Sequence, residues 1–148
     1  MRRRRTRLVL TAVLALLPVA GQAGDFSSIE ESVSAGAEIN YVFERWAALH
    51  FAVLNYAGEN RFPPEQATAA KDFISKLIAL SVVERRKSSK ASPEIVQDSV
   101  HQDVLRISEI YEARFRKNYA ETGQAFMQDA LVNADLDFCK YLGDELNG

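Results

Sequence analysis

The longest run of apolar residues outside the N-terminus extends from Ile39 to Tyr56, and its only formal charges are Glu44 and Arg45. At 3.6 residues per turn, the apolar side chains cover well over half of a helix surface. The polar side chains Tyr41, Arg45 and Asn55 share the remaining face. A helix with so wide an apolar surface needs neighbours on more than one side. The pattern therefore predicts the central helix of a bundle, and it falls short of the roughly 20 apolar residues of a membrane span.

Elsewhere, apolar residues recur at three- and four-residue steps, which predicts helices, and no segment alternates as a strand would. Pro64 and the pair Ser92 and Pro93 are start signals, because proline suits the first turn of a helix and serine caps it. Gly58 and Gly123 are stop signals, because glycine adopts the left-handed conformation that commonly ends a helix. We expect helices at about 28–57, 64–87, 93–121 and 124–142.

Two points of this assignment stay open. The small residues from Ser34 to Ala37 either loosen the first helix or allow another backbone to approach closely. Gly123 either separates two helices or kinks a continuous one, because so short a joint leaves little room for a turn. Gly143 is expected to end the last helix. Short connections imply antiparallel neighbours, so the expected fold is all-α, a small antiparallel four-helix bundle with up-down-up-down or similar topology.

Residues 1–23 have the pattern of a cleavable signal peptide. Arginines crowd the first positions ahead of an apolar run from Leu8 to Leu17, and small residues at Gly21 and Ala23 fit cleavage between Ala23 and Gly24. An uncleaved anchor is the weaker alternative, because the run is much shorter than a membrane span. The arginines leave the general and twin-arginine export routes both open. The expected product is exported, periplasmic or secreted, as one helical domain over 24–148 with no stable membrane span.

Removal of the signal changes the charge of the protein. It takes away five of the 18 basic residues and none of the 20 acidic ones, which leaves 125 residues with a net charge of −7. An acidic exported domain has little reason to bind nucleic acid or an anionic membrane through a broad basic surface. The segment from Tyr111 to Tyr119 interleaves aromatic and basic residues, and it is the one strip that suits an acidic protein partner.

Motifs for catalysis and metal binding are missing from the sequence. It has no G-x-S-x-G elbow, no glycine-rich phosphate loop and no paired cysteines. Cys139 is interpreted as a small buried hydrophobe, with an intermolecular or reactive thiol as the alternative. Asp98 and His101 form a single D-x-x-H pair, whereas a di-metal bundle needs two such pairs and further carboxylates. We therefore predict no catalytic residue, no metal site and no cofactor.

Two hypotheses for function follow. The first is an exported noncatalytic helical protein that binds another protein in the cell envelope, as an inhibitor, immunity factor, chaperone or adaptor would. The second is a ligand-binding bundle with a pocket near Trp46 and His50, for haem or another apolar molecule. Haem would need axial ligands such as His50 with His101 or Met127. An enzyme ranks third, and the sequence indicates neither the partner nor the oligomeric state.

Both hypotheses place function on one flank of the first helix. Its core stripe accounts for Phe43, Ala47, Phe51 and Leu54. A second apolar flank lies beside this stripe, and its cover must come from another helix, a ligand or a partner protein. The candidate site residues are those of the second flank: Ile39, Trp46, His50 and Val53.

Overall fold

The computed structural model describes residues 26–147, which form helices and, within that range, no strand. The predicted all-α class is confirmed. The signal peptide and its cleavage site between Ala23 and Gly24 lie outside the described residues. The elements are α1 (Ile29–Ser34), α2 (Ile39–Ala57), the short 3₁₀ turn η1 (Glu59–Arg61), α3 (Pro64–Ser88), α4 (Pro93–Thr122) and α5 (Ala130–Asn147).

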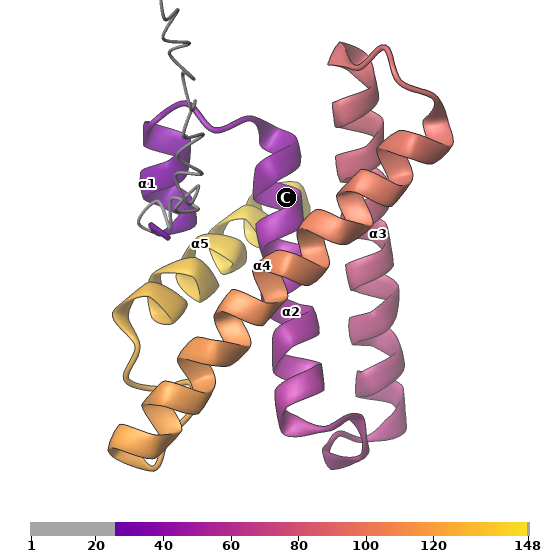
Figure 1. Cartoon of the computed structure of the whole chain (residues 1–148). Coiled ribbons are helices and arrows are strands. Elements are labelled where there is room, and N and C mark those ends of the chain that lie inside the picture. The colour runs from indigo at the N-terminus through magenta and orange to yellow at the C-terminus, as the bar shows by residue number, and fades with distance from the viewer. Residues whose placement is uncertain (1–25, 148) are drawn as a thin grey trace, which may run out of the picture.

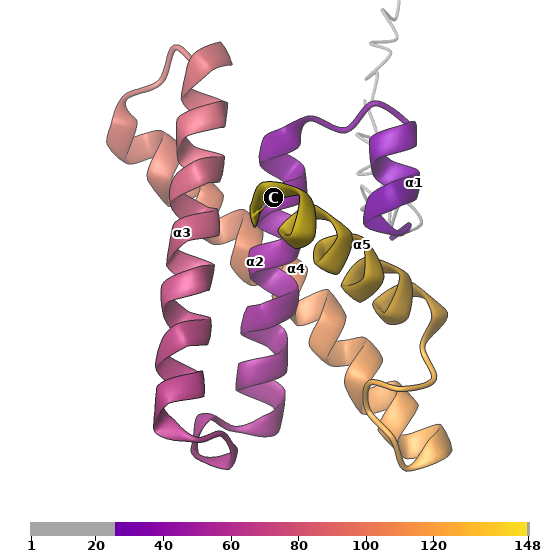
Figure 2. The same cartoon turned by 180° about the vertical axis from the view of Figure 1, so that it is seen from behind.

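Helices α2 and α3 run antiparallel side by side, and α4 crosses them obliquely on one face (Figure 1). On the opposite face, α5 lies across α2, with α1 beside it (Figure 2). The described part of the chain thus has five α-helices in crossed layers, and the expected four-helix bundle is not confirmed. Helix α2 lies at the centre, as the width of its apolar surface predicted.

Where the sequence predicts one helix over 28–57, the structure has α1 and α2. Helix α1 begins with a reciprocal capping box, in which Ser28 and Glu31 each accept a hydrogen bond from the other's backbone N–H at 3.2 and 2.9 Å. The chain then turns at Gly36, whose φ of 93° is a conformation that L side chains rarely adopt. The small-residue patch is therefore a turn, and Ile39 begins the central helix.

The connection between α4 and α5 also differs from the prediction. Gly123 ends α4 in the left-handed conformation, with φ 74°, as expected. Residues 124–129 are not helical, so α5 begins at Ala130 and not at 124. Asp129 caps it by accepting hydrogen bonds from the backbone N–H groups of Leu131 and Val132 at 2.9 and 3.1 Å. Helix α5 continues past Gly143, which therefore does not end it.

The core surrounds α2 and contains two charged residues that the sequence did not place there. Arg45, predicted on the polar face, is 0 % exposed, and the neighbouring Glu44 is 1 % exposed. Phe43 and Phe51, predicted as core, are only half-buried. Among residues 26–147, no helix combines the length and apolar character needed to cross a membrane. The apolar core is built from Ile29, Val42, Trp46, Ala47, Ala48, Leu49, Ala52, Leu77, Val100, Val104, Ile107, Tyr111, Phe115, Val132 and Cys139.

Candidate functional site

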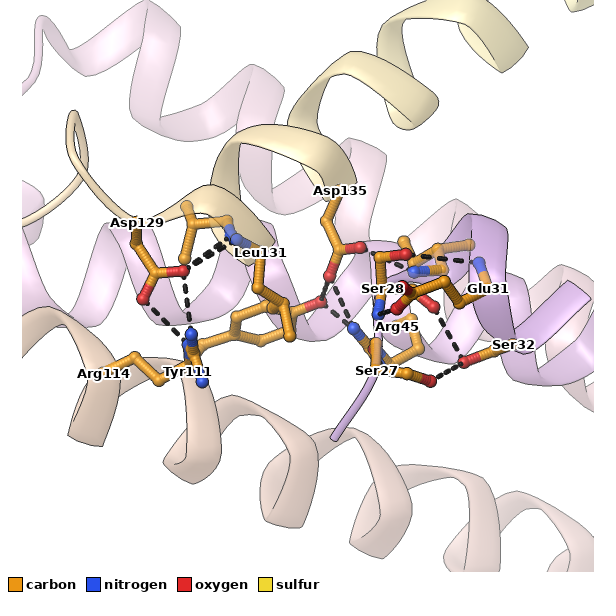
Figure 3. A network of polar contacts seen from close by, with 12 residues as sticks. Ser27, Ser28, Glu31, Ser32, Arg45, Tyr111, Arg114, Asp129, Leu131 and Asp135 are labelled. Atoms are coloured by element: carbon orange, nitrogen blue, oxygen red, sulfur yellow. Dashed lines mark hydrogen bonds and ion pairs between the residues drawn. The ribbon is translucent and has the colours of Figure 1, made fainter. Parts of the chain in front are cut away.

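Arg45 is the centre of a buried cluster of hydrogen-bonded polar and charged groups (Figure 3). Its guanidinium donates to Asp135 Oδ2 at 2.5 Å through Nη2 and to the Tyr111 hydroxyl at 2.9 Å through Nε. Nη1 donates to the Ser27 carbonyl at 3.0 Å and to the Tyr41 hydroxyl at 3.1 Å. The Phe26 ring covers the guanidinium, with Cζ 3.7 Å from the ring centroid. Four different segments of the chain thus converge on one cation.

Arg45 keeps its charge although it is buried. Burial opposes the positive charge of Arg45, but attraction from Tyr111 and Asp135 outweighs it and raises the pKa of the guanidinium. Burial also raises the pKa of Tyr111, so its hydroxyl stays protonated and donates a short hydrogen bond to Asp135. The other carboxylate oxygen of Asp135 accepts from the Ile29 N–H at 2.6 Å. The carboxylate therefore has a donor on each oxygen.

The Arg45 cluster positions helices and is not open to a substrate. Arg45, Tyr111 and Asp135 are all 0 % exposed, and none of them lines the hollows described below. Their interactions hold the start of α1 and the middle of α5 against α2 and α4. The cluster therefore serves as the framework that fixes α5, and the candidate binding surfaces lie elsewhere.

A second buried acid joins the other helices. Glu44 of α2 accepts hydrogen bonds from Ser81 of α3 at 2.6 Å and from Arg85 at 2.7 Å. Arg85 also pairs with Asp103 of α4 at 2.8 Å. Together these contacts hold the upper part of α3 and α4 against α2, so adjacent residues of α2 serve opposite faces of the molecule.

The structure separates the four predicted site residues. Ile39, at the start of α2, is 47 % exposed, whereas Trp46 is only 4 % exposed. Phe73 of α3 contacts the Trp46 ring edge-on with centroids 5.1 Å apart, and α5 passes over the same ring at Gly143. Trp46 is thus covered by the chain itself. His50 and Val53 are half-buried and line one pocket, which Ile39 and Trp46 do not.

The His50 pocket is a cavity of about 280 Å³ bounded by α2, the start of α3 and α5. The His50 Nδ1 lies 3.1 Å from the Trp46 carbonyl oxygen, and burial lowers the pKa of the imidazole. Its ring also meets Phe73 with centroids 5.2 Å apart. The lining residues are Leu49, His50, Val53, Leu54, Phe62, Gln66, Ala70 and Leu136.

Two neighbouring hollows lie along α3, the lower between α2 and α3 and the upper between α3 and α4, and we call them together the α3–α4 groove. It consists of two hollows of about 490 and 390 Å³ that share Ser75. At the lower hollow, the lining residue Asn55 donates a hydrogen bond to Glu112 of α4 at 2.6 Å. The groove is lined by Phe51, Leu54, Asn55, Gly58, Glu59, Lys71 and Ile74 below Ser75, and by Ile78, Ala79, Val82, Val83, Gln97 and His101 above it.

The basic strip predicted over 111–119 is largely neutralised within the chain. Arg114 forms a two-pronged ion pair with Asp129, with both N–O distances 2.9 Å. Burial alone would raise the pKa of Asp129. Its ion pair with Arg114 and its hydrogen bonds from the capped N–H groups outweigh burial and lower this pKa. Arg116 pairs with Glu112 at 2.7 Å. Arg114 thus joins α4 to the cap of α5, and Arg116 is paired within α4, which weakens the case for an acidic partner at this strip.

The residues predicted as possible haem ligands or as a reactive thiol lie at different places in the fold and do not form a common site. His50 lines its pocket, whereas His101 lies in the α3–α4 groove with Nδ1 2.9 Å from the Gln97 carbonyl. Met127 is exposed in the segment between α4 and α5. Cys139 is buried, and burial raises the pKa of its thiol. Within the described range, no three His, Cys, Asp or Glu side chains are grouped as metal ligands.

Sequence reasoning missed the groove and the Arg45 cluster for different reasons. The groove depends on α4 crossing α3 obliquely, and helical periodicity carries no information on a crossing angle. The cluster had one available signal, since a charged pair inside an apolar helix needs buried partners. Comparisons of the chain with family models, with curated proteins and with solved structures find no match.

Proposed function

We propose that the protein is an exported, noncatalytic helical protein that binds an amphipathic helix of a partner protein in the α3–α4 groove. The observation that carries the proposal is that two mostly apolar hollows lie one after the other along α3 and share the lining residue Ser75. Export is supported by the signal-like pattern of residues 1–23. N-terminal sequencing of the protein recovered from its host tests that part, with Gly24 as the expected first residue.

The shape of the groove suits a helix. Between Lys71 and Val83 it follows α3 for about 18 Å, or a little over three helical turns. Half-buried Ile78 and Val82 lie along its floor, and exposed Ala79 and Val83 extend its wall. An amphipathic helix docks in such a groove by inserting apolar side chains spaced three and four residues apart.

Charge indicates the kind of helix. The only charged residues that line the groove, Glu59 and Lys71, pair with each other at its lower end. The floor of the groove therefore favours a ligand helix that has an apolar face. The domain around it carries a net charge of −7 once residues 1–23 are removed, which attracts a partner with basic flanks. We infer a basic amphipathic helix as the ligand.

A synthetic peptide with leucine on one helical face and lysine on the other tests the groove. We expect saturable binding, measured by fluorescence anisotropy of the labelled peptide. Val83→Arg places a charge on the groove wall and is expected to weaken binding about tenfold or more, equivalent to about 1.4 kcal/mol. The affinity of the unmodified protein is also expected to fall with added salt, because exposed charges attract the peptide.

Ile95→Arg is the matched control. Ile95 is a β-branched residue of α4, 62 % exposed against 54 % for Val83, and it lies outside the groove. The two variants change the net charge equally, so a general electrostatic effect weakens both alike. Ile95→Arg should bind within about twofold of the unmodified protein. Equal affinities of the two variants, or no saturable binding by the unmodified protein, would overturn the proposed function.

A further inference from the structure

The His50 pocket has lining residues from both α2 and α5, and Figure 2 shows how α5 crosses α2. Its walls come from α2, the start of α3 and Leu136 of α5. No Asp, Glu, Lys or Arg lines it, so neither an anion nor a cation would find a countercharge there. At about 280 Å³ it is near the lower end of the range for ligand pockets, which selects a small molecule.

The hydrogen bond of His50 determines which ring nitrogen can serve a ligand. The Trp46 carbonyl oxygen can only accept, so in the neutral imidazole Nδ1 carries the proton that lies between them. Nε2 is then left with a free lone pair, and no described side chain or backbone group bonds to it. Burial keeps the ring neutral by lowering its pKa. His50 is therefore an oriented acceptor beside an apolar cavity.

The other polar group of the lining is Gln66, which is exposed. The enclosed part of the pocket is formed by aliphatic and aromatic side chains from three elements, with Phe62 at the connection into α3. A ligand that fits must bury an uncharged apolar body and can offer one hydrogen-bond donor to the imidazole. Such a pattern, mostly apolar walls with few convergent polar groups, is typical of small-molecule sites.

We propose that the His50 pocket binds a small uncharged apolar molecule that carries one hydroxyl or N–H group, with His50 Nε2 accepting its hydrogen bond. The Leu49, Val53 and Leu54 side chains enclose the apolar body. Leu136, an exposed leucine on α5, covers it from the other side. This site has Leu54 in common with the α3–α4 groove but otherwise different lining residues, and it does not depend on a protein partner.

The test uses 4-ethylphenol and ethylbenzene, which differ only in the hydroxyl group, in calorimetric titrations of the protein expressed from the full chain. We expect 4-ethylphenol to bind about fivefold more tightly, the size of one hydrogen bond of about 1 kcal/mol. His50→Phe should abolish this preference while ethylbenzene still binds. Equal affinity of the two probes for the unmodified protein, or no saturable binding of 4-ethylphenol, would exclude the proposal.

Two tryptophan substitutions on α3 locate the binding. Ala70→Trp fills the pocket from its half-buried edge and is expected to weaken 4-ethylphenol binding at least about tenfold. Ala79→Trp adds the same group on the groove side and should leave that affinity within about twofold. Val83→Arg should likewise leave it unchanged, so the pocket and the groove can fail independently. Ala70→Trp binding like the unmodified protein would show that the probe occupies another place.

Discussion

Arg45 satisfies two opposing demands, because its position in α2 is fully buried while its side chain is permanently charged. Burying such a charge costs several kcal/mol unless its donors are met in good geometry. Nε, Nη1 and Nη2 all donate hydrogen bonds, and the Phe26 ring lies against the remaining face. The cluster thus specifies how the helices meet more than it adds to their stability, because apolar replacements could fill the same space.

Removal of the Asp135 charge should reveal the free-energy cost of burying the Arg45 guanidinium without a counterion. Asp135→Asn keeps the size of the side chain but leaves Arg45 as a buried charge without a counterion. We expect the free energy of unfolding, measured by urea denaturation, to fall by about 3–5 kcal/mol. The double variant Arg45→Met with Asp135→Leu removes both charges and should lose less than Asp135→Asn. Additive losses in the double variant would contradict a mutual pair.

The partners of these charges could not be predicted from the sequence. Arg45 reaches Asp135 across 90 residues, and Glu44 reaches Arg85 across 41. Helical periodicity assigns a residue to a face of its own helix, but it does not identify what packs there. Helical periodicity predicted Arg45 on the polar face of its helix with Tyr41. In the structure, Arg45 is instead buried among α1, α4 and α5. Trp46 was placed correctly on an apolar flank, and the sequence left its cover open.

At the scale of elements, local chemistry explains where helices begin. Pro64 and Pro93 start α3 and α4 as predicted, since proline and serine act through the first turn alone. The turn at Gly36 and the loop over 124–129 were missed, because apolar residues continue at helical spacing through both. The loop is stabilised by distant groups such as Arg114, which holds the cap Asp129. Periodicity therefore predicted the elements better than their ends.

The effects of glycine-to-alanine substitutions on stability should distinguish the turn at Gly36 from a helical position such as Gly143. Gly36→Ala meets no steric neighbour within 4 Å, but its φ of 93° is unfavourable for alanine. We expect a loss of about 1–2 kcal/mol in the free energy of unfolding. Gly143→Ala is the control inside α5, where the added Cβ would lie an ordinary 3.8 Å from the Trp46 ring. There alanine should be neutral or stabilise by up to about 1 kcal/mol. A stabilising Gly36→Ala would instead favour a continuous helix over 28–57.

Across the whole molecule, α2 separates two groups of helices and two candidate binding surfaces. Glu44 holds α3 and α4 on one side, with the groove between them. Arg45 holds α1 and α5 on the other, where α5 forms one wall of the His50 pocket. Glu44 thus links α2 to α3 and, through Arg85, to α4, whereas its neighbour Arg45 links α2 to α5 and also bonds to Tyr111 of α4. This arrangement predicts that each face can loosen without the other.

Hydrogen exchange measured by mass spectrometry tests that independence. Asp135→Asn should raise amide exchange in α1 and α5, because α5 loses its ion pair with Arg45 and α1 is bonded to the same carboxylate through the Ile29 N–H, while α3 keeps its protection. Glu44→Gln should have the reverse pattern, with faster exchange in α3 and α4 near Arg85 and little change in α5. Exchange that rises equally in all helices for both variants would show one cooperative unit. Opposite patterns would show that α2 supports two faces whose stabilities are set by separate buried charges.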